Sequence, residues 1–265
     1  MKQNVNLKRT GFILLGILVF ILLAVFGAPK PDTVSAQANP SYLKSAQVAI
    51  DTAKNQRQYL FILFYNQKDD AFRAMDTAIQ NFLKKTPQRI ITYTALTTDN
   101  KEANIVTKYG IGQVQLPAVL VFAPNGAITG GYPQKVTEDQ LKKCLVAEIT
   151  MKILKTLQEQ KIALVMLQNG KTKFNQESTA AANDFANDSS VKGWVDLIKI
   201  DPDDSKNKEF LDSCNLNFQK KEATLVLLVP PNKIGGIYPG KTTKAAIMQG
   251  LSACSSGSCG AGGCN

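Results

Sequence analysis

The sequence contains no histidine among its 265 residues. Histidine is the usual general base beside a serine or cysteine nucleophile, and it is a common ligand of zinc and haem. Its absence therefore excludes Ser-His-Asp and Cys-His nucleophile pairs, HExxH zinc sites and haem ligated by histidine.

Clusters of arginine interleaved with aromatic residues are also lacking, although the chain has a formal net charge of +10. Such clusters are typical of surfaces that bind nucleic acid, so we expect no nucleic acid among the partners. A moderately basic surface favours anionic lipid headgroups, cell-wall polymers or acidic proteins. The alternative is a solvated lysine surface with no partner.

One segment departs from the composition of a globular protein. Residues 11–28 carry no charge, and Lys8 and Arg9 precede them. A run of about 20 apolar residues can span a bilayer, whereas a signal-peptide core is usually about 7 to 15 residues long. We therefore expect residues 1–28 to form a signal anchor, a single transmembrane helix, with a signal peptide cleaved after residues 36–38 as the alternative. The basic flank favours a cytoplasmic N-terminus, which places the rest of the chain on the periplasmic, extracytoplasmic side of the cell (inner) membrane.

The chain contains an internal repeat. Residues 120–132 read LVFAPNGAITGGY, and residues 227–238 read LLVPPNKIGGIY. Asn125 and Asn232 are 107 residues apart, which is the length of a small domain rather than of a solenoid unit. The sequence thus predicts two copies of one fold, with a flexible linker before them and a tail rich in Gly, Ser and Cys after them: linker 29–41, domains 42–149 and 150–253, tail 254–265.

Hydrophobic patterning predicts alternating strands and helices within each copy. The near-continuous apolar runs at residues 59–65 and 162–168 suit central strands that are covered on both faces. Residues 70–85 have the three- and four-residue spacing of an amphipathic helix, and residues 117–132 read as two strands joined by a Pro-Asn-Gly turn. This order predicts an α/β fold, with a mixed central sheet flanked by helices in each copy.

The boundary between the copies carries a helical pattern of its own. Residues 138–160 contain no glycine or proline, and their apolar residues keep helical spacing. Residues of high helix propensity dominate the segment. We therefore predict that the last helix of the first copy continues, with at most one bend, into the first helix of the second and couples the two domains rigidly.

A motif in the first copy resembles the thioredoxin superfamily: YGI at residues 109–111, QLPAVLVF at 115–122 and NG at 125–126. Together with the order of elements and the copy length, the resemblance covers most of residues 42–253. It implies tandem thioredoxin-like domains in which Pro117 is a cis-proline beside the groove that holds peptide in active members. Cis X-Pro bonds are uncommon, and the alternative is that Pro117 merely begins a strand. In the second copy Thr224 aligns with Pro117, so the feature is missing there.

Both copies lack the redox motif of that superfamily. Active thioredoxins carry a Cys-x-x-Cys pair where the helix after the central strand begins, because the helix N-terminus stabilises a thiolate. The corresponding residues are Asp69 and Phe72 in the first copy and Thr172 and Asn175 in the second. Dithiol exchange at the usual site is therefore chemically impossible, and we expect Asp69 and the following Asp70 to cap the helix instead.

An intact fold with an empty redox site predicts a redox-inactive binding or scaffold protein rather than an enzyme, and no cofactor. In this the chain is similar to the non-catalytic domains of protein disulfide isomerases, which hold polypeptides. We expect a protein partner or polypeptide to bind in a groove beside Pro117, lined by Tyr65, Phe72 and Ile111. The sequence leaves the oligomeric state open.

The five cysteines support a rival hypothesis, because an exported protein can form disulfides. An odd number leaves at least one thiol free or bound to another chain. Cys144 and Cys214 fall at positions expected to pack in the core. Cys254, Cys259 and Cys264 fall in the predicted tail, where four alternatives stand: a soft metal such as copper(I) or zinc, a disulfide within the tail or to a partner, thiol–disulfide exchange, and an unstructured tail.

Overall fold

The structure is a computed structural model that describes residues 43–213 and 221–255. These residues form two compact units, with the boundary between Val146 and Ala147. We refer to residues 43–146 as the N-terminal unit and to the described residues after them as the C-terminal unit. The predicted membrane segment and linker, Cys214, Cys259 and Cys264 lie outside the described residues. Within the described ranges, no helix has both the length and the apolar character that a membrane span requires.

A four-stranded mixed sheet with strand order β2-β1-β3-β4 forms the centre of the N-terminal unit. β1 (Tyr59–Tyr65) lies between β2 (Ile90–Leu96), to which it is parallel, and β3 (Ala118–Phe122), to which it is antiparallel. β4 (Ile128–Pro133) pairs with β3 at the edge. All residues of β1 except the last are buried, so helices must cover the sheet on both faces.

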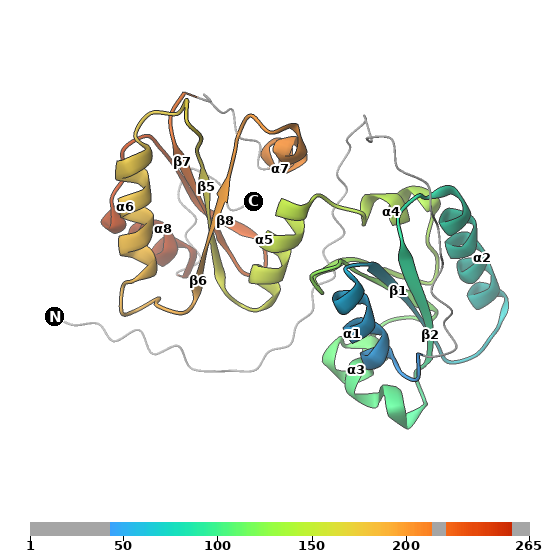
Figure 1. Cartoon of the computed structure of the whole chain (residues 1–265). Helices are drawn as coiled ribbons and strands as arrows, with labels where there is room; N and C mark the ends of the chain where they lie inside the picture. Colours follow the sequence, from blue (N-terminus) through green and yellow to red (C-terminus); the bar gives the residue numbers. More distant parts are fainter. Residues whose placement is uncertain (1–42, 214–220, 256–265) are drawn as a thin grey trace. The chain divides into compact units, whose positions relative to one another are not determined.

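The helices of this unit lie in two layers (Figure 1). α1 (Ala46–Gln56) and α3 (Ala103–Lys108) pack on one face, with the short 3-10 helices η2 (Asn100–Glu102) and η3 (Ile111–Gln113) beside α3. α2 (Asp70–Lys85) and the short α4 (Glu138–Lys143) lie on the other. The α2 layer is fixed by aromatic packing, since the rings of Phe61 in β1 and Phe82 in α2 stack with centroids 5.9 Å apart.

The C-terminal unit repeats this architecture. Its sheet has the order β6-β5-β7-β8, and β5 is again the buried central strand. One face packs against α5 and α7 and the other against α6 and α8. The elements are β5 (Ile162–Leu167), β6 (Val195–Ile200), β7 (Thr224–Val229), β8 (Lys233–Pro239), α5 (Glu148–Gln158), α6 (Asn175–Ala186), the 3-10 helix η4 (Ser205–Asn207), α7 (Lys208–Ser213) and α8 (Lys244–Ser255).

The two hairpins have the same register, and this corrects the alignment of the copies. Ala118 pairs with Pro133 and Thr224 pairs with Pro239, and in both hairpins the register shifts after the fourth residue pair counted from these. Across the hairpin the copies are therefore offset by 106 residues rather than 107, so Ala223 corresponds to Pro117. The prediction that Thr224 corresponds to Pro117 was wrong. It relied on aligning the turn residues Asn125 and Asn232, and the two turns differ in composition.

The predicted continuous helix between the copies does not form. α4 ends at Lys143, α5 begins at Glu148, and Ala147 between them is extended, with ψ 155°. Leu141 and Cys144 are fully buried in the N-terminal unit, whereas Ile149 and Ile153 are buried in the C-terminal unit. Each unit packs its own end of the segment, and this packing overrides a helix propensity that is high throughout.

A buried carboxylate joins α1 to the sheet of the N-terminal unit. Glu102 is fully buried; one of its oxygens accepts a hydrogen bond from the backbone N–H of Ala46 at 2.9 Å, and the other accepts one from the hydroxyl of Tyr93 at 2.7 Å. Burial and the bond to Glu102 raise the pKa of Tyr93. Glu102 thus satisfies a backbone donor in the first turn of α1 from a site 56 residues away.

We expect Glu102→Ala to lower the free energy of unfolding by about 2–4 kcal/mol, because it leaves two buried donors without an acceptor. Urea unfolding followed by circular dichroism measures the change. The neighbouring exposed substitution Asn104→Ala is the control and should leave the midpoint nearly unchanged. Equal midpoints for the two variants would contradict the role of Glu102.

Candidate functional site

The N-terminus of α2, at the end of the central strand, is the position where the sequence predicts a capping carboxylate, and Asp69 occupies it. Asp69 is the N-cap of α2, and its Oδ1 accepts a hydrogen bond from the backbone N–H of Phe72 at 2.9 Å. This bond lowers the pKa of Asp69, so the group is ionised at neutral pH. The prediction that Asp69 caps the helix is confirmed, and Asp70 is the first residue of α2.

Two aromatic rings and one cation lie beside this cap. Tyr65, the last residue of β1, and Phe72, in the first turn of α2, have ring centroids 4.8 Å apart at an angle of 51°. The ammonium group of Lys68 lies 5.6 Å from the Tyr65 centroid and 5.8 Å from that of Phe72. Phe72 is 7% exposed, while Tyr65 is half-buried and Lys68 is exposed. Phe72 therefore supports the Tyr65 ring from below, and the half-buried Tyr65 supplies most of the accessible apolar surface, with a positive charge over it.

The third component precedes β3. The Leu116–Pro117 peptide bond is cis, as the resemblance to thioredoxins implies. Pro117 itself is buried, and Leu116 is half-buried. The carbonyl oxygen of Pro117 accepts a hydrogen bond from Gln134 N–H at 2.6 Å, which ties this segment to the end of β4.

The structure brings together Tyr65 and Phe72 but places Ile111 elsewhere. Ile111 is 2% exposed and packs in the core between the sheet and the α1–α3 layer. β1 residues that contribute to that core, such as Phe64, point to the opposite face from Tyr65, because side chains alternate along a strand. Ile111 therefore offers no surface to a partner at the aromatic pair.

The corresponding region of the C-terminal unit, the loop between β5 and α6, is polar. Thr172 is 7% exposed, its hydroxyl lies 2.6 Å from Asn175 Oδ1, and the Asn175 amide donates to the carbonyl of Asn169 at 2.7 Å. No side chain caps α6, in contrast to α2. Thr172 and Asn175, which occupy the two positions of the missing redox pair, form hydrogen bonds within the loop.

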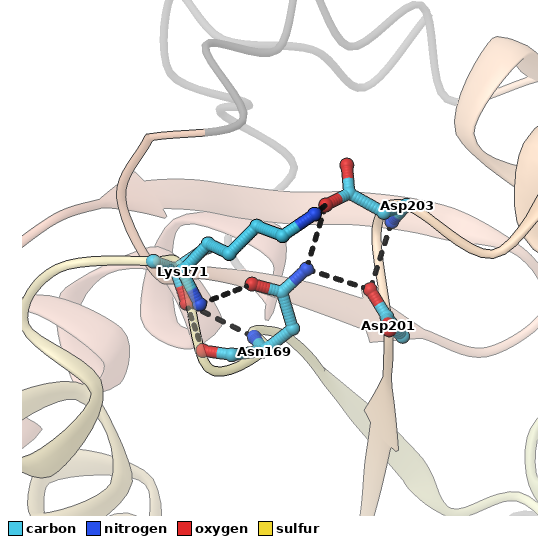
Figure 2. Close-up of polar contacts among 5 residues, drawn as sticks. Asn169, Lys171, Asp201 and Asp203 are labelled. Carbon is cyan, nitrogen blue, oxygen red and sulfur yellow. Dashed lines mark hydrogen bonds and ion pairs between the residues drawn. The ribbon is translucent and has the colours of Figure 1, made fainter.

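Sequence reasoning missed a charged network beside this loop. Figure 2 shows the amide of Asn169 between two carboxylates; it donates to Asp201 at 2.8 Å and to Asp203 at 3.0 Å. Lys171 Nζ lies 3.6 Å from Asp203. The DPDD sequence at residues 201–204, directly after β6, was the available signal. Because protein donors already satisfy both carboxylates, the network is structural, and the residues described contain no group of side chains suited to a metal ion.

The two cysteines that the structure describes, Cys144 and Cys254, lie at or near the C-terminal ends of helices. Cys144 is fully buried, as predicted, and its thiol donates to the carbonyl of Gln140 at 3.2 Å. Cys254 lies in the last turn of α8 and packs against the core of the C-terminal unit. Its assignment to the tail was therefore wrong: the Gly/Ser-rich segment begins after α8, because Ile247, Met248 and Leu251 extend the apolar face of that helix.

We expect Cys144 to resist alkylation in the folded protein. Burial raises the pKa of its thiol from 9.0 to about 11, so at pH 8 the thiolate fraction falls about a hundredfold. Iodoacetamide labelling mapped by mass spectrometry, with and without urea, measures the rate at this residue. The rate should rise through pH 11 rather than near pH 9, and equal rates in folded and unfolded protein would contradict this assignment.

No family model and no curated protein matches the sequence. Among solved structures, the chain aligns with the first two thioredoxin domains of Saccharomyces cerevisiae Eps1p at 11% identity, over 84% of this chain and 98% of that one, with a TM-score of 0.27. It also aligns with the zinc-bound form of human ERp44 at 12% identity, over 80% of this chain and 60% of that one, with a TM-score of 0.32. At such scores these likenesses carry no argument. The thioredoxin-like description of the two units rests on their strand order and helical layers.

Proposed function

We propose that this protein is a non-catalytic, thioredoxin-like binding protein that holds an extended segment of a polypeptide or protein partner at its N-terminal unit. The observation that carries the proposal is the composition of one small region. Asp69 caps α2 where a thiolate would stand, while the aromatic pair Tyr65–Phe72 and the cis peptide bond at Pro117 are present beside it.

The chemistry of this region favours binding over electron transfer. A carboxylate held by a backbone N–H has no redox activity, and Phe72 at the second position of the motif has none either. Aromatic side chains supply a large apolar contact area at low entropic cost, and they are enriched at binding hot spots. Lys68 over the rings adds a cation that favours acidic groups in the partner.

The proposal includes a tether. The charge-free residues 11–28 after a basic flank support a single-pass anchor, with the two thioredoxin-like units on the extracytoplasmic side of the membrane. A tethered binding unit acts at a high effective concentration on partners at the same surface. Extraction of membranes with alkaline carbonate tests this part, since an anchored chain stays in the pellet and a cleaved or soluble one is released.

We expect substitutions in the aromatic pair to weaken binding of an unfolded polypeptide. Truncation of a hot-spot aromatic costs about 1–3 kcal/mol, so Tyr65→Ala and Phe72→Ala should each raise the Kd at least about fivefold. The measurement is fluorescence anisotropy with labelled, reduced and carboxymethylated α-lactalbumin as the probe. Lys68→Ala, an exposed position, tests the same surface without touching the core and should raise the Kd about two- to fivefold.

The matched control is Trp194→Ala. Trp194 is an exposed aromatic in the C-terminal unit, 53% exposed, and its removal should leave the Kd unchanged. Circular dichroism verifies that each variant is folded. A Kd that is the same in wild type, Tyr65→Ala, Phe72→Ala and Lys68→Ala would rule out the aromatic pair as the binding surface.

We also expect no turnover in insulin reduction by dithiothreitol beyond the uncatalysed rate. The double variant Asp69→Cys/Phe72→Cys places two thiols at the N-terminus of α2, where the helix dipole favours a thiolate, and it should gain activity. Turbidity of the reduced insulin chains measures the rate. Robust turnover by the wild-type protein would overturn the non-catalytic assignment.

A further inference from the structure

The C-terminal unit has a backbone bridge that has no counterpart beside Pro117 in the described part of the N-terminal unit. Lys173, in the loop between β5 and α6, forms an isolated parallel bridge with Glu222, just before β7. The N–H of Lys173 donates to the carbonyl of Lys221 at 2.9 Å, and the N–H of Ala223 donates to the carbonyl of Lys173 at 2.8 Å. The loop is thus bridged, through Lys173, to the segment just before β7.

The second of these bonds depends on which residue stands at the position of Pro117. Ala223 corresponds to Pro117 in the hairpin register, and the carbonyl of each accepts a bond from the residue after the outer strand: Gln134 in one unit and Gly240 in the other. Proline has no N–H to donate. Among the described residues, no backbone hydrogen bond joins residues 66–71 to residues 113–117, so the segment before β3 is not paired with the loop.

A side chain completes the closure. Phe174 has a φ of 63°, which is uncommon for a bulky residue and persists only where the surroundings fix it. A Cβ on Gly240 would lie 3.5 Å from the Phe174 ring. Lys241 Nζ lies 5.2 Å from the ring centroid and 3.6 Å from Glu177. The N-terminal unit has the small, exposed Ala71 in place of Phe174.

We propose that the segment 172–174 acts as a built-in ligand of the C-terminal unit, so that each chain holds one polypeptide segment, at the N-terminal unit alone. The inference rests on the proposed function for its statement about binding, whereas the closure itself is independent of any partner. Loss of the Ala223 N–H would release segment 172–174 and leave the chain before β7 free to bind another polypeptide.

Amide hydrogen exchange on the full chain tests the closure without a ligand. The Lys173 amide should exchange at least about a hundredfold more slowly than that of Asp70, the corresponding residue of the N-terminal unit. Ala223→Pro, which removes the donor, should speed exchange at Lys173 at least about tenfold, and Ala223→Ser, which keeps it, should not. Rapid exchange at Lys173 in the wild type, or equal rates in the two variants, would overturn the closure.

The number of bound polypeptides tests the assignment of the site. At saturation, labelled carboxymethylated α-lactalbumin should bind once per wild-type chain and once per Ala223→Ser chain. The Ala223→Pro chain should bind a second molecule of α-lactalbumin. Binding of this second molecule should remain in the double variant Phe72→Ala/Ala223→Pro. Two copies bound by the wild type would overturn the closed groove. Binding by none of these proteins would instead refute the proposed function, while slow exchange at Lys173 still supports the closure.

Discussion

Both units depend on a central strand whose side chains are buried on both faces of the sheet. β1 and β5 each carry an almost unbroken apolar run, and neither face of such a strand tolerates water. Two helical layers per unit follow from this requirement, and so does the position of the helix after the central strand. The loop after β1 or β5 leaves the sheet at the carboxyl end of the strand to reach that helix, and the candidate site of the N-terminal unit is built there.

The two units share one scaffold but differ in the loop that follows the central strand. In the N-terminal unit, a capping carboxylate, an aromatic pair and a cis peptide bond leave an amphipathic surface. In the C-terminal unit, asparagine, threonine and aspartate side chains bond among themselves, and the loop pairs with the segment before β7. The residue just before the inner hairpin strand, Pro117 or Ala223, decides whether a backbone N–H is available there.

The sequence was sufficient for features that depend on local pattern. The apolar run of β1, the amphipathic spacing of α2 and the cap at Asp69 each appear as predicted, since burial and helix-end chemistry decide them within a few residues. Features set by competition between the two cores were not predictable in this way. The break at Ala147 arises because Cys144 and Ile149 pack in different units, although the local propensity is helical throughout.

The sequence pattern also did not predict the strand register of the second copy or the face of the sheet on which some side chains pack. A motif alignment placed the second copy one residue off, because the turns have different compositions while the paired strands fix the true correspondence at Ala223. Ile111 read as a groove residue but packs in the core of the opposite face. The network around Asn169 joins residues more than 30 positions apart, which only the parallel pairing of β5 and β6 brings together.

The outer edges of the two sheets have a consequence for association between molecules. β4 and β8 both contain a Gly-Gly pair and end in proline, and a Cβ on Gly130 would collide with the sulfur of Cys144. Glycine lets the last helix of each unit lie close against its edge strand, and proline withholds a donor at the end of that strand. The β4 and β8 edges are therefore poor templates for an incoming strand, and extension of either sheet at these edges is disfavoured.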